Sequence, residues 1–304
     1  MFYGCELTFD GKSCTAFDLM LYDFASNKQE DASLASPGEL ITDHVPGRYD
    51  TYLYGIDQSQ QLEYKLILCS NAARVNQGRF FSRSEIANIA KWLCGHQVWK
   101  WLSIQQDDML QYQYKCLITS MRVLTHGAVP WGFEFTVKCD SPYAYRAITW
   151  DSDLDEVLTG AGINQTSFTI TREDSYHGDL YPVIEVTLLN DGSSTFSIVN
   201  HSDSDRACTF TGLPSYITKM RIDGDKQTIT VFAGEDGTDA VIDTETGEII
   251  EPATDPTWTE ISTNVFPYFN KQFFRLKDGS NVCALSGGIS KMTMSYYAPY
   301  DIGA

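Results

Sequence analysis

The sequence predicts a mainly β protein built from two domains. Its 304 residues include 17 Tyr and 16 Phe, and aromatic side chains favour strands over helices. Short segments alternate apolar and polar residues, most clearly where Phe133, Phe135, Val137 and Cys139 point to one side, as in a half-buried strand. The length is comfortable for two domains that each bury a core.

The distribution of charge supports a division of the chain near residue 150. Residues 1–150 carry 13 Lys and Arg against 16 Asp and Glu, a net charge of −3. Residues 151–304 carry 9 against 24, a net charge of −15. We therefore expect a β-sandwich-like domain with one helix over residues 1–150 and a second β-sandwich over residues 151–304.

The first half opens with a hairpin signal, because Asp10-Gly11 lies between apolar residues. A strand is expected from Phe17 to Tyr22, and a polar, irregular loop or arm from Ser26 to Leu40. Pro46-Gly47 then turns the chain into a short aromatic strand. The alternation of Leu62, Tyr64, Leu66 and Leu68 predicts the next strand.

A helix is predicted after Ser82, which with Glu85 fits a capping box. Ile86, Ile89 and Leu93 share one face, and Gly95 can end the helix. Strands are expected at 99–102, 112–119 and 121–124, followed by the strand that closes the domain. Ser141-Pro142 stops that strand, because proline cannot donate to a sheet ladder and holds its predecessor extended.

The second half begins with an acidic, small-residue stretch at 151–162 that is typical of a linker. Short strands at sandwich spacing follow. Strand pairs are expected on either side of Asp223-Gly224-Asp225 and of 244–247. Further strands are expected at Ile184–Leu188, Phe196–Ile198, Phe273–Leu276, Asn281–Val282 and Ile289–Tyr296.

Composition and motifs exclude several functions. The strong acidity argues against specific nucleic-acid binding, which requires clustered Lys and Arg. No apolar run is long enough to span a membrane, and no signal peptide is visible, so we expect the protein to be made and folded in a cytoplasm. The eight cysteines form no CxxC pair and are expected to be reduced and structural.

Catalytic and cofactor motifs are also missing from the sequence. No HExxH, GxGxxG, GxxxxGK[ST] or GxSxG occurs, and the five histidines are scattered. Neither the carboxylates around Asp151–Glu156 nor the pair Asp223 and Asp225 fits a calcium loop. We therefore expect no catalytic residues, no cofactor and no metal site.

Four elements in order carry a resemblance to a known family. They are an opening LTFDGKSCTAFDLML, the VPGR turn near residue 46, the helix EIANIAKWL and the closing strand FEFTVKCDSPYAY. Together they resemble the distal tail proteins of long-tailed bacteriophages, and FFRLKDGSNV with the final MTMSYY is similar to that family's lectin-like second domain. The signature positions that match are Phe9, Asp10, Gly11, Pro46, Gly47, Arg48, Pro142 and Tyr143.

The resemblance implies a structural protein of the virion tail, assembled in the host cytoplasm. It implies a homohexameric ring that joins the tail tube to the tip or baseplate, with the tail tube protein, a tail hub or tail-associated protein and a receptor-binding protein as partners. Residues 26–42 and the edge strands of the first half are candidate interface segments. Two alternatives stay open: a carbohydrate-binding module or adhesin for host cell-wall sugar, and a glycosidase.

Overall fold

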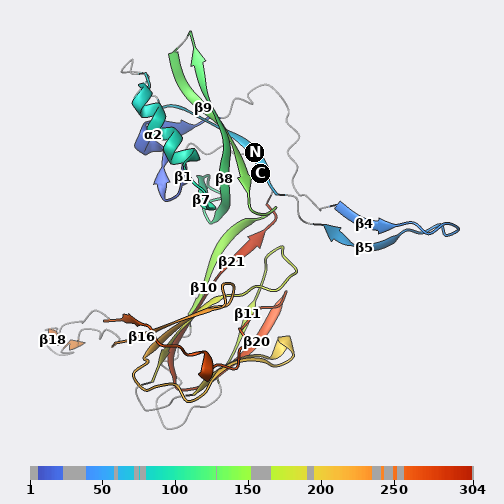
Figure 1. The fold of residues 1–304 in the computed structure, drawn as a ribbon, viewed down its shortest axis with the longest axis vertical. Helices are drawn as coiled ribbons and strands as arrows, with labels where there is room; N and C mark the ends of the chain where they lie inside the picture. Colours follow the sequence, from blue (N-terminus) through green and yellow to red (C-terminus); the bar gives the residue numbers. More distant parts are fainter. Residues whose placement is uncertain are drawn as a thin grey trace. The chain divides into compact units, whose positions relative to one another are not determined.

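The computed structural model describes residues 6–22, 39–57, 61–71, 75, 80–127, 129–151, 166–189, 195–234, 241–242, 249–251 and 257–302. These residues form mainly antiparallel sheets (Figure 1), which confirms the mainly β fold class. The chain divides into two compact units, Met1–Arg146 with Pro299–Ala304, and Ala147–Ala298. It therefore crosses between the units twice, inside β10 (Ala144–Asp151) and inside β21 (Ile289–Tyr300).

The first unit is organised around one antiparallel sheet with the strand order β3-β6-β9-β8-β7-β1-β2. Its strands are β1 (Glu6–Phe9), β2 (Lys12–Ser13), β3 (Leu19–Leu21), β6 (Glu63–Ser70), β7 (Lys100–Gln105), β8 (Tyr112–His126) and β9 (Val129–Cys139). The expected turn at Asp10-Gly11 is confirmed, because Phe9 pairs with Lys12 and both turn residues have positive φ. That backbone matches the two-residue hairpin turns.

Strand β8 is one continuous strand where the sequence predicted two, at 112–119 and 121–124. The register with β9 shifts between Ile118 and Ser120, so the chain accommodates an irregularity without leaving the sheet. Such a bulge bends a strand and does not end it. The alternation that identified β9 is confirmed, since Phe133, Phe135, Val137 and Cys139 are all buried.

The helix α2 (Arg83–Cys94) is confirmed in its position and in both caps. Ser82 and Glu85 form the reciprocal capping box, and Gly95 is the C-cap. The helix lies against the strands of the first unit (Figure 1) and buries Ile89, Trp92 and Leu93. Its position is fixed by an apolar face that belongs to the core of the unit.

The second unit is a sandwich of two antiparallel sheets over one core. The first sheet contains the neighbours β19-β16-β15-β12-β21, and the second has the order β11-β20-β13-β14. The remaining bounds are β11 (Thr166–Thr171), β12 (Val183–Leu188), β13 (Phe196–Asn200), β14 (Arg206–Phe210), β15 (Lys219–Asp223), β16 (Thr228–Ala233), β19 (Thr259–Ile261) and β20 (Ser280–Gly287). Inward side chains from both sheets, including Val186, Met292, Ile198 and Phe210, lie in the same buried cluster.

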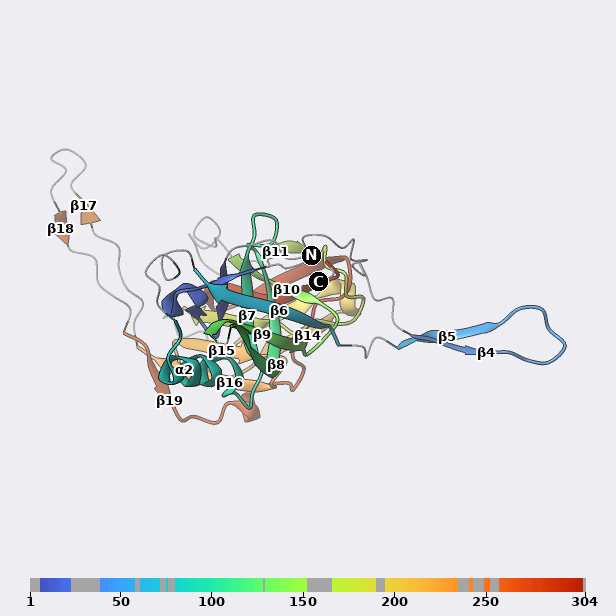
Figure 2. The same cartoon turned by 90° about the horizontal axis from the view of Figure 1, so that it is seen from above.

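Two further strand pairs each form a two-stranded sheet. Strands β4 (Glu39–Asp43) and β5 (Tyr52–Asp57) run side by side as a ribbon in both views (Figures 1 and 2). Strands β17 (Val241–Ile242) and β18 (Ile249–Glu251) pair across the expected turn at 244–247, which lies outside the described residues. The expected loop at 26–38 and the linker at 152–162 also lie outside them.

Two predicted strands are wrong in part. Residues Cys14–Phe17 form a 3-10 turn before β3, because the Ser13 hydroxyl accepts from the Thr15 N–H and Asp18 adopts the left-handed conformation. The segment Phe273–Leu276 makes only an isolated bridge between Leu180 and Leu276. The Phe273 and Arg275 carbonyls accept hydrogen bonds from the side chains of Arg206 and Asn200, which replace a strand partner.

Candidate interaction surface and polar network

The eight signature positions lie in three separate turns. Phe9 is buried, and Asp10 forms an ion pair with Lys100 at 3.0 Å. Tyr143 is also buried, and its N–H donates to the Ser141 hydroxyl at 3.2 Å, which fixes the turn around Pro142. These two groups of positions stabilise the first unit.

The third group, Pro46-Gly47-Arg48, forms the turn that joins β4 to β5. The Arg48 N–H donates to the Val45 carbonyl at 3.1 Å and Gly47 has φ +91°. This is the geometry of a type II turn, with proline at its second position and glycine at its third. The Arg48 guanidinium lies 5.0 Å from the centre of the Tyr52 ring and 3.5 Å from the Asp50 carboxylate.

The β4–β5 hairpin exposes many large apolar side chains. Leu53 and Tyr54 are 61% and 69% exposed, and Tyr49 at the turn is fully exposed. The full set is Leu40, Ile41, Val45, Tyr49, Tyr52, Leu53 and Tyr54. They lie on both faces of the ribbon and stay largely exposed in the described part of the chain, and exposed apolar side chains gathered on one segment mark a contact site.

The backbone of the hairpin also has unpaired strand edges. Among the described strands, β4 and β5 pair only with each other, so each has one edge without a strand partner. An isolated two-stranded hairpin is marginally stable in water, and open edges readily accept another strand. We call the described residues 39–57 the hairpin arm. Its composition and its open edges are those of a segment that becomes covered on assembly.

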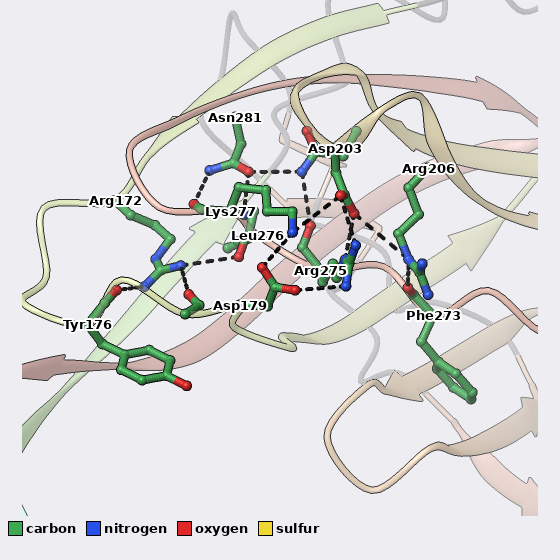
Figure 3. Close-up of polar contacts among 12 residues, drawn as sticks. Arg172, Tyr176, Asp179, Asp203, Arg206, Phe273, Arg275, Leu276, Lys277 and Asn281 are labelled. Atoms are coloured by element: carbon green, nitrogen blue, oxygen red, sulfur yellow. Dashed lines mark hydrogen bonds and ion pairs between the residues drawn. The ribbon is translucent and has the colours of Figure 1, made fainter. Parts of the chain in front are cut away.

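The second unit contains a network of charged residues around Asp203 (Figure 3). The Asp203 carboxylate accepts from the Arg275 Nε at 2.6 Å and from an Arg275 terminal nitrogen at 3.0 Å. Asp179 contacts Arg275 at 2.7 Å and Lys277 at 2.8 Å. The Arg275 hydrogen bonds, with help from Lys277, lower the pKa of Asp203 despite its burial.

Two asparagines and Arg206 extend the network along the segment before β20. Asn200 donates to the Arg275 carbonyl at 2.9 Å and to the Asn281 side chain at 2.8 Å, and Arg206 donates to the Phe273 carbonyl at 2.8 Å. Asp179 is shared by Arg275 and Lys277, and Asp203 is shared by the same two cations and Arg206. We conclude that the network holds the irregular segment 273–277 against β13 and β14.

A separate buried ion pair lies nearby in the second unit. Arg172 and Asp174 are both essentially inaccessible to solvent, and two guanidinium nitrogens contact the two carboxylate oxygens at 2.9 and 2.7 Å. The remaining donors reach the carbonyls of Tyr176, Gly178 and Leu276 (Figure 3). Every donor direction is used, as a buried guanidinium requires.

No cluster of side chains suited to metal binding occurs in the described part of the chain. No group of three or more His, Cys, Asp or Glu residues lies within reach of one ion there. The predicted acidic candidate Asp223 uses both carboxylate oxygens on Lys226, at 2.9 Å from its N–H and 2.7 Å from its Nζ. Asp153, Asp155 and Glu156 lie outside the described residues.

Histidines in the same described ranges stand singly. His96 contacts the Trp92 carbonyl at 2.8 Å, His177 contacts Asp278 at 2.7 Å and His201 contacts Asp205 at 2.6 Å. The partner is a backbone carbonyl for His96 and a carboxylate for His177 and His201, and these last two pairs are exposed. In the residues that the structure describes, no helix is long and apolar enough to cross a bilayer.

Comparison with known proteins decides the nature of the first half. Residues 2–141 match a family described as "Phage tail protein N-terminal domain". The first half is therefore similar to the N-terminal domain of phage tail proteins. The match ends at the Ser141-Pro142 stop, just before the end of the first unit at Arg146. No curated protein matches the chain in sequence.

Two solved structures share the fold over nearly the whole chain. The Dit protein (gp 19.1) of phage SPP1, described as a paradigm of the hub adsorption apparatus in phages that infect Gram-positive hosts, superposes with a TM-score of 0.53 at 11% identity, covering 96% of this chain and 98% of that one. A chain of the phage p2 baseplate gives 0.51 at 10% identity, covering 98% and 99%. The resemblance predicted from the sequence is confirmed for the fold, which this chain shares with the SPP1 Dit protein and the p2 baseplate chain.

Sequence reasoning predicted the turn of the hairpin arm but not its first strand. It named residues 26–42 and the edge strands of the first half as candidate interface segments; of residues 26–42 only 39–42 are described, and they belong to β4. The available signal was the density of Leu, Ile and Tyr on both sides of Pro46-Gly47. The polar network left no signal, because its members come from three distant stretches of the chain, around residues 179, 200–206 and 273–281.

Proposed function

We propose that this protein is a structural hub of a phage tail tip, whose copies form a homohexameric ring between the tail tube and the tip or baseplate. The observation that carries the proposal is the hairpin arm. Its exposed apolar side chains and open strand edges require a partner surface, and a neighbouring copy of the first unit supplies one in a ring. Support from the fold comes from the likeness to tail and baseplate proteins.

A ring that closes by rotation uses one surface on each copy to receive another surface of its neighbour. The hairpin arm is suited to the donating role because it buries apolar area without disturbing its own core. Burial of apolar surface is worth roughly 25 cal/mol per Å². The proposed role requires no catalytic residue, since recognition is the activity.

Charge favours the first half as the ring-forming part. Residues 1–150 carry −3 and can meet copies of themselves with little repulsion, whereas residues 151–304 carry −15. Close like charges repel by about a kcal/mol or more per pair at intermediate dielectric, and salt screens only beyond about 8–10 Å. We therefore place the second unit away from the ring contacts, with the tail tube protein, the tail hub protein and a receptor-binding protein as the ring's partners.

The test compares two double variants of the full chain. Leu53→Asp with Tyr54→Asp places two charges on the hairpin arm. The matched control, Tyr216→Asp with Val282→Asp, places two charges on exposed apolar positions of the second unit. Mass in solution, measured by light scattering over a concentration series, should show assembly of the wild type and the control and at least about tenfold weaker assembly of the arm variant. Equal assembly of all three proteins would refute the role of the arm.

A further inference from the structure

Two buried cysteines face each other across the longest strand pair of the first unit. Cys116 in β8 and Cys139 in β9 are register partners, and both are fully buried. Directly opposed residues in an antiparallel pair project from the same face of the sheet. The two side chains therefore enter the same part of the core.

The hydrogen bonds on either side show which kind of opposed pair this is. The Asp140 N–H donates to the Lys115 carbonyl at 2.9 Å, so the adjacent pair, Lys115 and Asp140, is the hydrogen-bonded one. The Cys139 N–H points the other way and donates to the Leu62 carbonyl at 2.8 Å. Opposed pairs alternate along an antiparallel ladder, so Cys116 and Cys139 form a non-hydrogen-bonded pair.

That class of pair has the dimensions of a disulfide. Its Cα atoms lie about 4.5 Å apart, with the side chains closer than in the hydrogen-bonded class, and disulfides span Cα separations of about 4.4–6.8 Å. We propose that Cys116 and Cys139 are a site of disulfide formation, which closes within the existing backbone when the chain folds under oxidising conditions.

The other described cysteines lack this geometry. Cys208 and Cys283 lie on β14 and β20, which are separated by β13. Two strand spacings amount to about 9.5 Å, beyond the reach of a disulfide. Cys69 faces Met20 across its strand pair and not Cys14, and Cys94 is exposed on α2. Among the described cysteines that lie in paired strands, the register places only Cys116 and Cys139 opposite each other.

The reaction is a thiol–disulfide exchange with a small disulfide such as oxidised glutathione. One cysteine thiolate attacks the oxidant, forming a mixed disulfide and releasing one glutathione. The second cysteine thiolate then attacks the mixed disulfide and releases the other. Two protein thiols are oxidised, one glutathione disulfide is reduced, and the two thiol protons pass to the two glutathione products.

The folded state opposes this exchange in both directions. Burial raises the pKa of the Cys139 thiol to about 12, and burial together with the neighbouring Cys139 raises the pKa of Cys116 well above its ordinary value. Thiolates are the reactive species, so the closed fold keeps the thiols inert and equally shields a formed disulfide. The redox state of the pair is therefore set at folding and retained afterwards.

A disulfide between Cys116 and Cys139 would affect the stability of the β8–β9 strand pair. The register shift at Ile118 to Ser120 follows directly after this pair. A bond between Cys116 and Cys139 would tie the strands before the irregularity and raise the thermal midpoint of the first unit by roughly 5–10 °C.

The experiment refolds the full chain from denaturant in a glutathione redox buffer and, separately, in excess dithiothreitol. Each product is then unfolded, alkylated without reduction and mapped by mass spectrometry. We expect two fewer alkylated cysteines in the oxidised product and one peptide linked through Cys116 and Cys139. Native reduced protein exposed to oxidised glutathione should react at least about a hundredfold more slowly than unfolded protein.

Variants separate the pair from the other thiols. Cys116→Ala should abolish the linked peptide, whereas the buried control Cys208→Ala should retain it, with folding of each checked by circular dichroism. Peptide mapping of the wild-type protein is by itself sufficient to test whether Cys116 and Cys139 become linked. Complete alkylation after oxidative refolding, or a link between other cysteines in its place, would overturn the proposal, as would a lower thermal midpoint for the linked form.

Discussion

The Trp92 indole N–H donates to the Phe9 backbone carbonyl at 3.0 Å across 83 residues of sequence. The bond ties α2 to the β1–β2 hairpin at the turn that carries Asp10 and Gly11. The Trp92 ring also stacks on Phe17, with ring centres 4.8 Å apart. One side chain therefore fixes the helix, the opening hairpin and the 3-10 turn to one another.

Removing that donor should destabilise the first unit. Trp92→Phe keeps an aromatic ring but leaves the buried Phe9 carbonyl without its indole partner. We expect a loss of about 1–3 kcal/mol in the free energy of unfolding, measured by urea denaturation. The exposed control Asn88→Ala in the same helix should change the free energy of unfolding by less than about 0.5 kcal/mol. Equal effects of the two changes would show that the bond does not stabilise the unit.

The buried pair of the second unit should be costly to break. Arg172→Ala leaves the Asp174 carboxylate buried without its cation and removes the guanidinium donors from three carbonyls. Such removal costs about 3–5 kcal/mol. The comparison is Arg122→Ala, which breaks the largely exposed pair with Glu134 and should cost no more than about 1 kcal/mol. Chemical denaturation of both variants measures the difference, and similar values would contradict the assignment.

Acid should weaken the network around Asp203. Hydrogen bonds from Arg275 lower the folded-state pKa of Asp203 below its unfolded value. The pair therefore contributes its full stability above the unfolded pKa of about 3.9 and loses it as the pH falls through the lower folded pKa. We expect Asp203→Asn to be less stable than the wild type at pH 7 and to depend less on pH below about pH 4. The exposed control Asp225→Asn should keep the wild-type profile in a series of thermal melts.

The C-terminal residues should stabilise the first unit and not the second. Tyr300 packs edge-on to Tyr112, with ring centres 5.4 Å apart, and Ile302 packs on the core of the first unit. Tyr300→Ala should therefore lower the midpoint of the first unit by several degrees, since aromatic pairs and their burial contribute a few kcal/mol. Hydrogen exchange resolved by peptide assigns the loss to a unit. Loss of protection confined to 166–298 would instead favour the division at residue 150.

Local signals predicted those elements whose stability is local. The capping box of Ser82 and Glu85 predicted both ends of α2, and Asp10-Gly11 predicted its turn, because each depends on residues a few positions apart. The segment 273–277 could not be predicted in this way. Its alternating apolar residues resemble a strand, yet its carbonyls are satisfied by Asn200 and Arg206, which lie about 70 residues away. Likewise, opposition of Cys116 and Cys139 follows from the register and not from their spacing.

The central claim is that copies of this chain form a ring, and electron microscopy of the purified full-length protein tests it most directly. Class averages in physiological salt should show a closed ring with sixfold symmetry and a central channel, and the Leu53→Asp, Tyr54→Asp variant should show single particles of one chain. Wild-type protein that remains single chains at every concentration, or that forms open filaments, would contradict the account.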